Sequence, residues 1–175
     1  MHAPAAANSP SNTAQRSLVA FELLILGIGV TQFAFAPASI ERPMIAVSTL
    51  ATLASLILML RIPSPLRKRA QLQHGLSIAV MCVAISVLAF ATGSAHSLFT
   101  ALYCLPIVAA AIAFGRWWLV ALLALVIAAI GMLLGALTPG IDLRNPEFAM
   151  LMLSKLLPGL AIALILGGLL EQMQT

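Results

Sequence analysis

Charged side chains are scarce in this chain, and their scarcity excludes most soluble folds. Asp, Glu, Lys and Arg together make up 8% of the 175 residues, whereas hydrophobic residues make up 62%. Soluble domains carry roughly 25% charged residues. A soluble core cannot bury this much apolar surface, so the composition predicts a membrane protein.

Cysteine and histidine are also sparse, which limits the chemistry that we expect. Cys82 and Cys104 fall inside different apolar runs, so they are interpreted as small core residues and not as a disulfide framework. His2, His74 and His96 are spread along the chain, which argues against a shared metal or haem site. The sequence has no phosphate-binding glycine loop, dinucleotide fingerprint, HExxH or CxxC motif. We therefore expect no cofactor and no enzymatic activity.

Acidic residues are fewer than basic ones, which leaves a formal net charge of +4. Basic proteins often bind nucleic acid, but here the basic residues lie at the ends of apolar runs and are not interleaved with aromatic residues. That placement favours contact with anionic lipid headgroups and control of membrane orientation. We expect the lipid bilayer, and no nucleic acid, as a partner.

The chain is organised around an apolar region from Tyr103 to Leu137. Two apolar runs there are joined by a few residues around Gly115 and Arg116. Each run is close to the ~20 residues that a helix needs to cross a hydrocarbon layer of ~30 Å. The charged residue falls where the chain must turn back through water. The region therefore predicts two membrane helices joined by a tight turn.

Apolar runs and short polar loops alternate along the rest of the chain in the same way. They predict an all-α, polytopic membrane bundle of about six transmembrane helices. The expected helices are 18–36, 44–60, 75–91, 97–114, 117–137 and 148–170.

Three segments are expected from this pattern. Residues 1–16, rich in Ala, Pro, Ser and Asn, are expected to form a disordered cytoplasmic tail. Residues 17–171 are expected to form the six-helix transmembrane domain. Residues 172–175 are expected to begin a cytoplasmic signalling helix.

Basic residues are distributed unequally between the two sides of this predicted bundle. With both termini in the cytoplasm, the inner segments carry six of them, and the outer loops carry Arg42 and Arg144. This bias follows the positive-inside rule. It predicts a multi-pass protein of the bacterial cytoplasmic (inner) membrane with both termini inside. The residues expected to anchor the inner face are Arg67, Lys68, Arg69, Arg116, Trp117 and Trp118.

Polar side chains within the apolar runs mark a candidate ligand cavity. Ser48, Thr52 and Ser55 share one helix face because they are spaced at i, i+4 and i+7. In membrane helices such hydroxyls often bond a neighbouring backbone and let helices approach. The alternative is a small polar cavity open to the outer side. Its expected lining residues are Lys155, Gln32, Tyr103, Ser48, Thr52, Ser55 and Thr100.

Lys155 is a basic residue placed well inside an expected helix, and two interpretations of it stay open. In one, its ammonium group extends outward to lipid phosphates or to Glu147 or Asp142 in the adjoining loop. In the other, it points into the bundle and is available to a carboxylate ligand from the outer side. Glu22 is not expected to pair with it, because Glu22 begins the first helix on the inner side.

Glycine and proline residues indicate where helices approach or bend. Gly131 and Gly135 form a GxxxG pattern, which permits close packing inside the bundle or in a homodimer. Pro106 and Pro158 each remove a backbone hydrogen bond in mid-membrane. We expect kinks there, either static or acting as hinges.

The run LYCLPIVAAAIAFGRWWLVALLALVIAAI resembles the multi-helix membrane sensor regions that precede diguanylate cyclase (GGDEF) or histidine kinase domains in bacteria. The residues that carry the resemblance are YxLP, an apolar stretch, and FG followed by Arg at the turn. The ending LGGLLEQMQT looks like the start of a signalling helix. The resemblance implies a sensory or anchoring module that passes a signal through the sixth helix to a cytoplasmic kinase or cyclase output domain or partner protein.

A second class of protein has a similar predicted topology. The chain resembles substrate-binding subunits of small-solute or vitamin transporters, and Ala34 and Ala38 offer the small-xxx-small pattern that such subunits use for docking. An intramembrane enzyme is less favoured, because the sequence offers no paired nucleophile and base.

Overall fold

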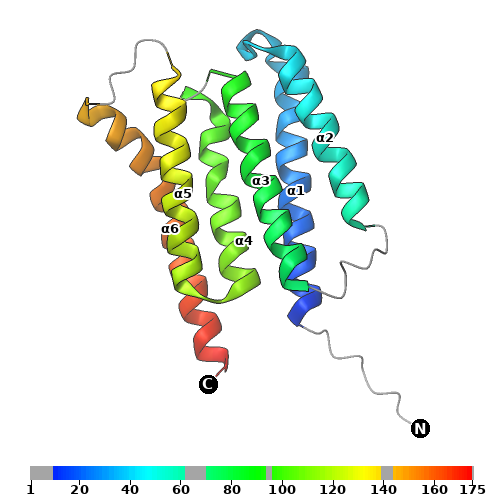
Figure 1. The fold of residues 1–175 in the computed structure, drawn as a ribbon, viewed down its shortest axis with the longest axis vertical. Coiled ribbons are helices and arrows are strands. Elements are labelled where there is room, and N and C mark those ends of the chain that lie inside the picture. Colours follow the sequence, from blue (N-terminus) through cyan, green and yellow to red (C-terminus); the bar gives the residue numbers. More distant parts are fainter. Residues whose placement is uncertain (1–9, 62–69, 94–95, 139–143, 175) are drawn as a thin grey trace.

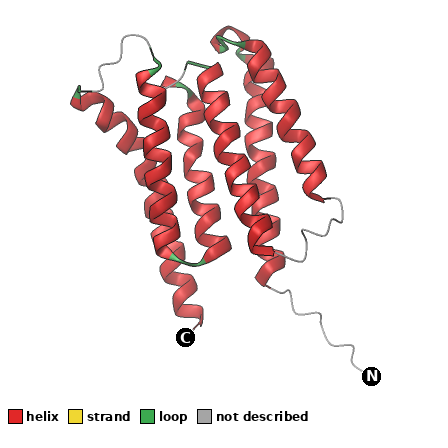
Figure 2. Cartoon of the chain, in the orientation of Figure 1, coloured by secondary structure: helices red, strands yellow, loops and turns green. Residues whose placement is uncertain are grey.

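The computed structural model describes residues 10–61, 70–93, 96–138 and 144–174. Within these ranges the chain forms six α-helices and two short 3-10 helices, and Figure 2 shows loops and turns between them. The all-α prediction is confirmed. The helices are α1 (Pro10–Phe35), η1 (Pro37–Ser39), α2 (Pro43–Arg61), α3 (Ala70–Ala91), η4 (Leu98–Tyr103), α4 (Cys104–Phe114), α5 (Trp117–Ala136) and α6 (Pro146–Gln174).

The α-helices stand side by side and alternate in direction along the chain (Figure 1). The start of α1 and the end of α6 lie at the same end of the bundle, which we call the termini end. Helices α1, α3 and α5 finish at the other end, which we call the opposite end. The chain therefore returns to the side from which α1 starts.

Four helices are long and apolar enough to cross a membrane, through the segments Ala14–Phe35, Gln71–Ala91, Trp118–Ala136 and Pro146–Ile165. Two further apolar segments, Pro43–Met59 and Leu98–Phe114, are shorter. The 19 residues of α2 still reach roughly 28 Å at ~1.5 Å per residue, close to the ~30 Å of a hydrocarbon core. The number of membrane crossings stays a prediction.

A 3-10 segment lengthens the other short span. Six residues form η4 and 11 form α4. Because a 3-10 helix rises ~2.0 Å per residue, the two together also reach roughly 28 Å.

Helix α3 is the centre of the bundle. It packs against α1, α2, η4, α4 and α5, and 56% of its apolar segment is buried, compared with 17% for α6. Met81, Ile85 and Leu88 are among its fully buried side chains. Helix α2 lies at one edge, packed on α1 and α3, and α6 lies at the other edge, packed mainly on α4.

Helix α1 begins at Pro10, well before the expected start at Leu18. Proline suits the first turn of a helix, where its missing N–H has no acceptor within the helix. Ala14 is buried, so this early part of α1 already packs in the bundle. Helix α1 therefore extends into residues 10–16, which were expected to belong to the tail. Helix α3 likewise begins at Ala70 and not at the expected Gly75.

The predicted tight turn between the two central apolar runs is confirmed. Gly115 ends α4 in the left-handed conformation, with φ 59° and ψ 13°, and its N–H donates to the Ala111 carbonyl at 3.0 Å. Glycine suits this position because a Cβ is unfavourable there. Arg116 follows with extended backbone and an exposed side chain, and α5 begins at Trp117.

Pro106 does not interrupt the middle of an α-helix, contrary to the prediction. The expected fourth helix is divided into η4 and α4, and Pro106 lies in the first turn of α4. Backbone N–H groups in a first turn have no acceptor within the helix, so proline costs little there. Ser97 caps η4, since its hydroxyl oxygen accepts from the Phe99 N–H at 3.1 Å.

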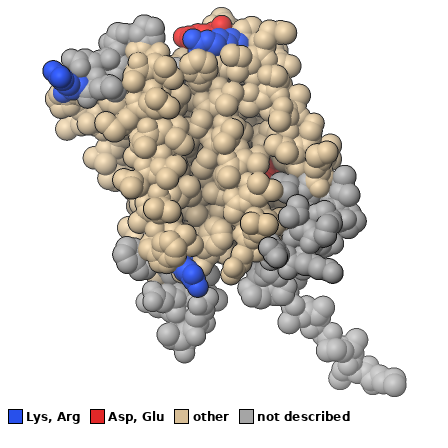
Figure 3. All heavy atoms as spheres, viewed as in Figure 1, with Lys and Arg blue, Asp and Glu red and all other residues tan. Residues whose placement is uncertain are grey.

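The surface is apolar between its two ends. On the face drawn in Figure 3, blue and red side chains lie at the two ends of the bundle, with one small red patch between them. Large apolar side chains such as Val83, Leu125 and Ile165 are exposed. Soluble proteins rarely expose so continuous an apolar surface, whereas a bilayer covers it with hydrocarbon.

Candidate functional site

A series of hydrogen bonds joins α6, η4 and α3 near the opposite end. The Lys155 ammonium group donates to Thr100 Oγ1 at 2.5 Å, and the Thr100 hydroxyl donates to the Ser97 carbonyl at 2.6 Å. Ser97 Oγ and Thr92 Oγ1 lie 2.5 Å apart, and Thr92 donates to the Leu88 carbonyl at 2.7 Å. We call Lys155, Thr100, Ser97 and Thr92 the opposite-end network.

The members of this network are well enclosed. Thr100, Ser97 and Thr92 are buried, and Lys155 is half-buried. Each hydroxyl has a hydrogen-bond partner, as buried polar groups require. The Lys155 ammonium group thus reaches a buried hydroxyl of a neighbouring element. This arrangement corresponds to the interpretation in which the side chain points into the bundle.

Two other predicted cavity residues bond elsewhere. Tyr103 is buried, and its hydroxyl lies 2.7 Å from Ser86 Oγ on α3. The Gln32 amide donates to Ser39 Oγ at 3.1 Å, which ties the end of α1 to η1. Gln32 Oε1 is buried without a hydrogen-bond partner among the described residues. Neither side chain has a hydrogen bond to Lys155 among the bonds within the described part of the chain.

The predicted hydroxyl stripe of α2 is also separate. Ser48, Thr52 and Ser55 are exposed, and each donates to a carbonyl of its own helix, at 3.0, 2.7 and 2.8 Å respectively. Since α2 packs on α1 and α3, these hydroxyls do not face α6. The expected single cavity is therefore not formed, because bonds within one helix satisfy hydroxyls that the sequence pattern alone places on a shared face.

An open groove of about 430 Å³ lies between α2 and α3. Leu56, Leu76 and Val83 are among its apolar lining residues, and Ser48 and Thr52 contribute hydroxyls. Those hydroxyls already bond within α2. The groove thus presents an apolar surface of the kind that hydrocarbon covers in a bilayer.

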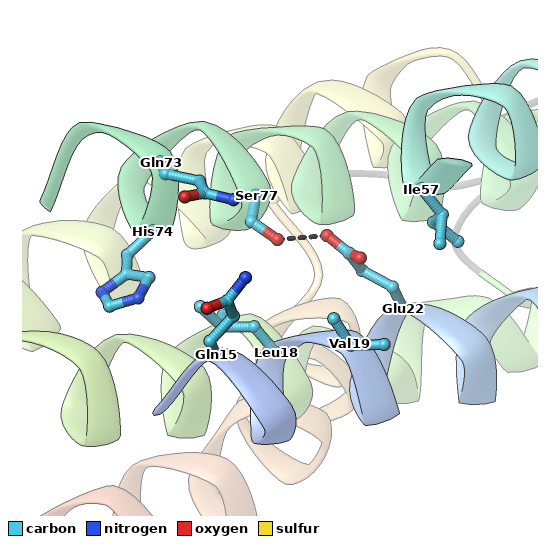
Figure 4. A pocket seen from close by; sticks show the side chains of 8 residues that line it. All are labelled: Gln15, Leu18, Val19, Glu22, Ile57, Gln73, His74 and Ser77. Carbon is cyan, nitrogen blue, oxygen red and sulfur yellow. Dashed lines mark hydrogen bonds between the residues drawn. The ribbon is translucent and has the colours of Figure 1, made fainter. Parts of the chain in front are cut away.

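A second polar cluster lies toward the termini end (Figure 4). The Ser77 hydroxyl of α3 donates to Glu22 Oε1 of α1, and the Glu22 side chain is only 2% exposed. His74, one turn before Ser77, is also buried. These groups surround a cavity of about 30 Å³, which we call the termini-end chamber. Its lining residues are Gln15, Leu18, Val19, Glu22, Ile57, Gln73, His74 and Ser77.

Helical periodicity places these groups around one cavity. Gln15 and Glu22 are separated by two turns of α1, and Gln73 and Ser77 by one turn of α3, so each pair shares a helix face. Sequence reasoning used Glu22 only to exclude it as a partner of Lys155. The carboxylate itself was the signal for this cluster. Ionisable residues within membrane segments almost always face the bundle interior, so Glu22 should have been expected there.

The GxxxG glycines pack inside the chain. A Cβ on Gly131 would lie 2.9 Å from Met152 Sδ, and one on Gly135 would overlap the Phe148 ring. Both partners belong to α6, so the two glycines let α5 and α6 approach. A homodimer stays a prediction.

Helix α6 packs directly against the backbone of α4 beside a proline. A Cβ on Gly159 would lie 2.7 Å from Cys104 Cα, which is a backbone contact that side chains cannot relieve. The adjacent Pro158 lies inside α6 and lacks the N–H that would bond Ser154. Figure 1 shows α6 changing direction along its length. Close packing and a weakened helix therefore coincide at residues 158–159.

The predicted inner-face anchors are only partly described. Arg67, Lys68 and Arg69 lie outside the described residues, and Trp117 is described by its backbone alone. Arg116 is exposed, and Trp118 is 50% exposed. Both flank the turn between α4 and α5, at the termini end.

Arg42 joins the start of α2 to the end of α3 at the opposite end of the bundle. Its guanidinium group donates to the Phe90 carbonyl at 2.7 Å and lies 4.0 Å from the centre of the Phe90 ring, and its N–H donates to the Ala91 carbonyl at 3.0 Å. These carbonyls end α3 and have no partner within the helix. Arg42 thus holds the start of α2 against the end of α3.

No protein-family model, curated protein or solved structure matches this chain. The resemblance of the Tyr103–Arg116 region to bacterial sensor regions therefore stays a prediction. The fold and the two clusters define a class of protein, namely a helical bundle with four membrane-compatible spans, a hydrogen-bonded network near one end and a polar chamber toward the other.

Proposed function

We propose that this chain is a multi-pass module of the bacterial cytoplasmic membrane, which senses a signal at its outer side or in the bilayer and passes it through α6 to a cytoplasmic kinase or cyclase output. In this orientation the termini end is cytoplasmic and the opposite end faces outward. The proposed role is non-enzymatic.

The observation that carries the proposal is the length of α6 and the position of its two ends. It is 29 residues long, and its apolar segment ends at Ile165, so the helix continues to Gln174 past that segment. Figure 1 shows this last part extending beyond the turn between α4 and α5. Near its other end, Lys155 bonds the opposite-end network. One helix thus connects a buried polar network to a projecting end.

The packing of α6 favours movement. Only 17% of its apolar segment is buried, the smallest share among the four spans, so α6 lies at the edge of the bundle with much of its surface facing outward. Its close approach to α4 is concentrated at Gly159, beside Pro158. A helix at the edge of a bundle that is weakened at an internal proline can tilt or turn relative to its neighbours, which is a common way to pass a signal between sites.

A transporter subunit is less well supported. The seven residues expected to line a substrate cavity lie in separate groups, and the expected docking pair does not share a helix. Ala34 is in α1, which ends at Phe35, whereas Ala38 is in η1. Pro37 causes this separation, because it cannot continue an α-helix whose N–H groups are bonded.

The test is to fuse residues 1–175 to a kinase or cyclase domain and to measure its basal output in membranes. Gly159→Ala forces α6 away from Cys104, so we expect the output to change about fivefold or more, which corresponds to an ordinary coupling free energy. Gly168→Ala is the matched control, since a Cβ there meets nothing within 4 Å. Equal outputs from both variants at equal protein levels would contradict the proposal.

The same fusion tests the orientation. Cysteines introduced at the exposed His96 and Arg116 lie at opposite ends of the bundle. In intact cells, an impermeant maleimide should label His96→Cys, and it should label Arg116→Cys after the inner face is opened. The reverse order of labelling would place the termini outside and exclude a cytoplasmic output.

A further inference from the structure

The open groove between α2 and α3 is about as long as one leaflet of a bilayer is deep. Its lining on α3 extends from Leu76 to Val87, which is roughly 16 Å at ~1.5 Å per residue. One leaflet contributes about half of the ~30 Å hydrocarbon core. The volume of the groove, about 430 Å³, falls within the ~300–1,000 Å³ that is typical of small-molecule sites. The groove therefore has room for an acyl chain of a lipid from one leaflet.

The helix faces that line the groove continue to Arg42 and the end of α3. Phe90 and Ala91 follow Val87 by one helical turn, so they lie on the same face of α3. Arg42 immediately precedes α2 and donates to the carbonyls of Phe90 and Ala91. A lipid with its acyl chain in the groove therefore places its headgroup beside Arg42, at the opposite end of the bundle.

Two opposite charges are available at this end of the groove. Arg42 is exposed, and among the described residues its guanidinium group, with five N–H donors, has one hydrogen bond, to the Phe90 carbonyl. Glu41 is also exposed and lies at the same end of α3, since its Oε1 is 3.8 Å from the position of a Cβ on Gly93. Within the described part of the chain the Glu41 carboxylate has neither a hydrogen bond nor an ion pair.

This pair of charges favours a zwitterionic headgroup with N–H donors. A guanidinium group binds phosphate through parallel N–H donors, and a primary ammonium group donates hydrogen bonds to carboxylates. Phosphoethanolamine carries both a phosphate and a primary ammonium group. A phosphoglycerol headgroup offers no cation to Glu41, and the cation of phosphocholine has no N–H donor.

We propose that the groove between α2 and α3 binds one phosphatidylethanolamine molecule. One acyl chain lies along the groove, the phosphate contacts Arg42, and the ammonium group contacts Glu41. The site requires that the bundle spans a membrane with its opposite end at one surface. It does not depend on the sensory role proposed above.

Native mass spectrometry of the purified full chain in detergent tests the headgroup. Phosphatidylethanolamine, phosphatidylcholine and phosphatidylglycerol with identical acyl chains are added in turn, and the Kd of the first bound lipid is measured. We expect the Kd of phosphatidylethanolamine to be about tenfold lower than the other two, because each of the others lacks the charged hydrogen bond to Glu41. A Kd of either other lipid that equals or falls below it overturns the proposal.

A groove variant tests the acyl-chain contact. Val83 is 63% exposed and lines the groove, so Val83→Trp fills it and should raise the Kd of phosphatidylethanolamine at least about tenfold, through lost apolar burial. Leu125→Trp is the matched control, because Leu125 is 69% exposed on α5, and it should keep the wild-type Kd. An unchanged Kd in Val83→Trp, or a weakened one in Leu125→Trp, overturns the proposal.

A charge variant tests the headgroup contact separately. Glu41→Gln should raise the Kd of phosphatidylethanolamine to that of phosphatidylcholine and leave the latter unchanged. Glu147→Gln, which alters an exposed carboxylate on α6, should change neither value. Because the Glu41 carboxylate has no bond to lose, this variant decides if Val83→Trp does not fold. A Glu41→Gln protein that still prefers phosphatidylethanolamine, or a Glu147→Gln protein that does not, overturns the proposal.

Discussion

The opposite-end network and the termini-end chamber both place polar groups inside an apolar bundle, but they differ in the space beside those groups. In the network, side chains and carbonyls follow one another at 2.5 to 2.7 Å from Lys155 through to Leu88. In the chamber, a cavity of about 30 Å³ lies beside Glu22 and Ser77. Polar side chains therefore form a cross-link at one end and line a space at the other.

The two clusters also differ in the burial of their charges. Lys155 is half-buried and has a long stem, which lets its ammonium group reach the buried Thr100 hydroxyl while part of the side chain stays exposed. Glu22 is 2% exposed and has a short side chain, so its environment is determined by the helices around it. The network therefore joins α6, η4 and α3, whereas the chamber leaves a small space beside α1 and α3.

Thr100→Val should have the largest effect on stability. The change removes the acceptor of Lys155 and the donor to the Ser97 carbonyl. Two lost bonds, one of them to a charged group, should lower the free energy of unfolding by about 2 kcal/mol. Unfolding of the purified protein in mixed micelles measures this. Valine keeps the shape of threonine, so packing is retained.

Lys155→Met provides the control for that prediction. Methionine keeps most of the stem and removes the charge. On the Lys155→Met background, Thr100→Val should cost less than on the wild-type background, because the bond between the two side chains is already gone. Additive effects would show that the two residues are not coupled and would remove Lys155 from the network.

Ser77→Ala should have the next largest effect, and Ser86→Ala is its match on the same helix. Ser77 donates to a buried carboxylate, whereas Ser86 bonds the neutral hydroxyl of Tyr103. We expect Ser77→Ala to lower the free energy of unfolding by about 1 kcal/mol more than Ser86→Ala does, since hydrogen bonds to charged groups are stronger. Equal losses of unfolding free energy, measured in the same micelles, would mean that the bond from Ser77 to the Glu22 carboxylate is no stronger than the bond between Ser86 and Tyr103.

The hydroxyls of α2 should matter least. Ser48, Thr52 and Ser55 are exposed and bond their own helix, so replacing all three by Ala should change the free energy of unfolding by less than about 1 kcal/mol. A larger loss would show that α2 contributes to a polar site. The exposed face of α2 would then be a third polar region to compare with the network and the chamber.

The general plan of the bundle was predictable because local signals specify it. The apolar run lengths predict the helices, and Gly115 with Arg116 predicts the tight turn of the central hairpin. Helix starts were less predictable. Pro10 begins α1 within a segment whose composition is typical of disorder, because tertiary packing at Ala14 supports an early turn.

The polar sites were predicted only in part. The sequence placed both Lys155 and Thr100 in one expected cavity, and they are bonded to each other, but the pattern does not say which helices adjoin. Helix α2 lies at the edge of the bundle, so its hydroxyls are separated from α6, and Tyr103 bonds α3 instead. The chamber was missed because its residues come from two helices that are distant in the sequence.

The sequence by itself determined the class of this protein, because hydrophobic run length and the near absence of charge are properties of each segment taken alone. Tertiary structure decided which segments adjoin. It placed Gly159 on Cys104, Lys155 on Thr100, and Glu22 on Ser77. Apolar helices with similar faces can pack in many orders, so the arrangement depends on the fit of small residues and on the pairing of a few polar groups, which are properties of the whole bundle.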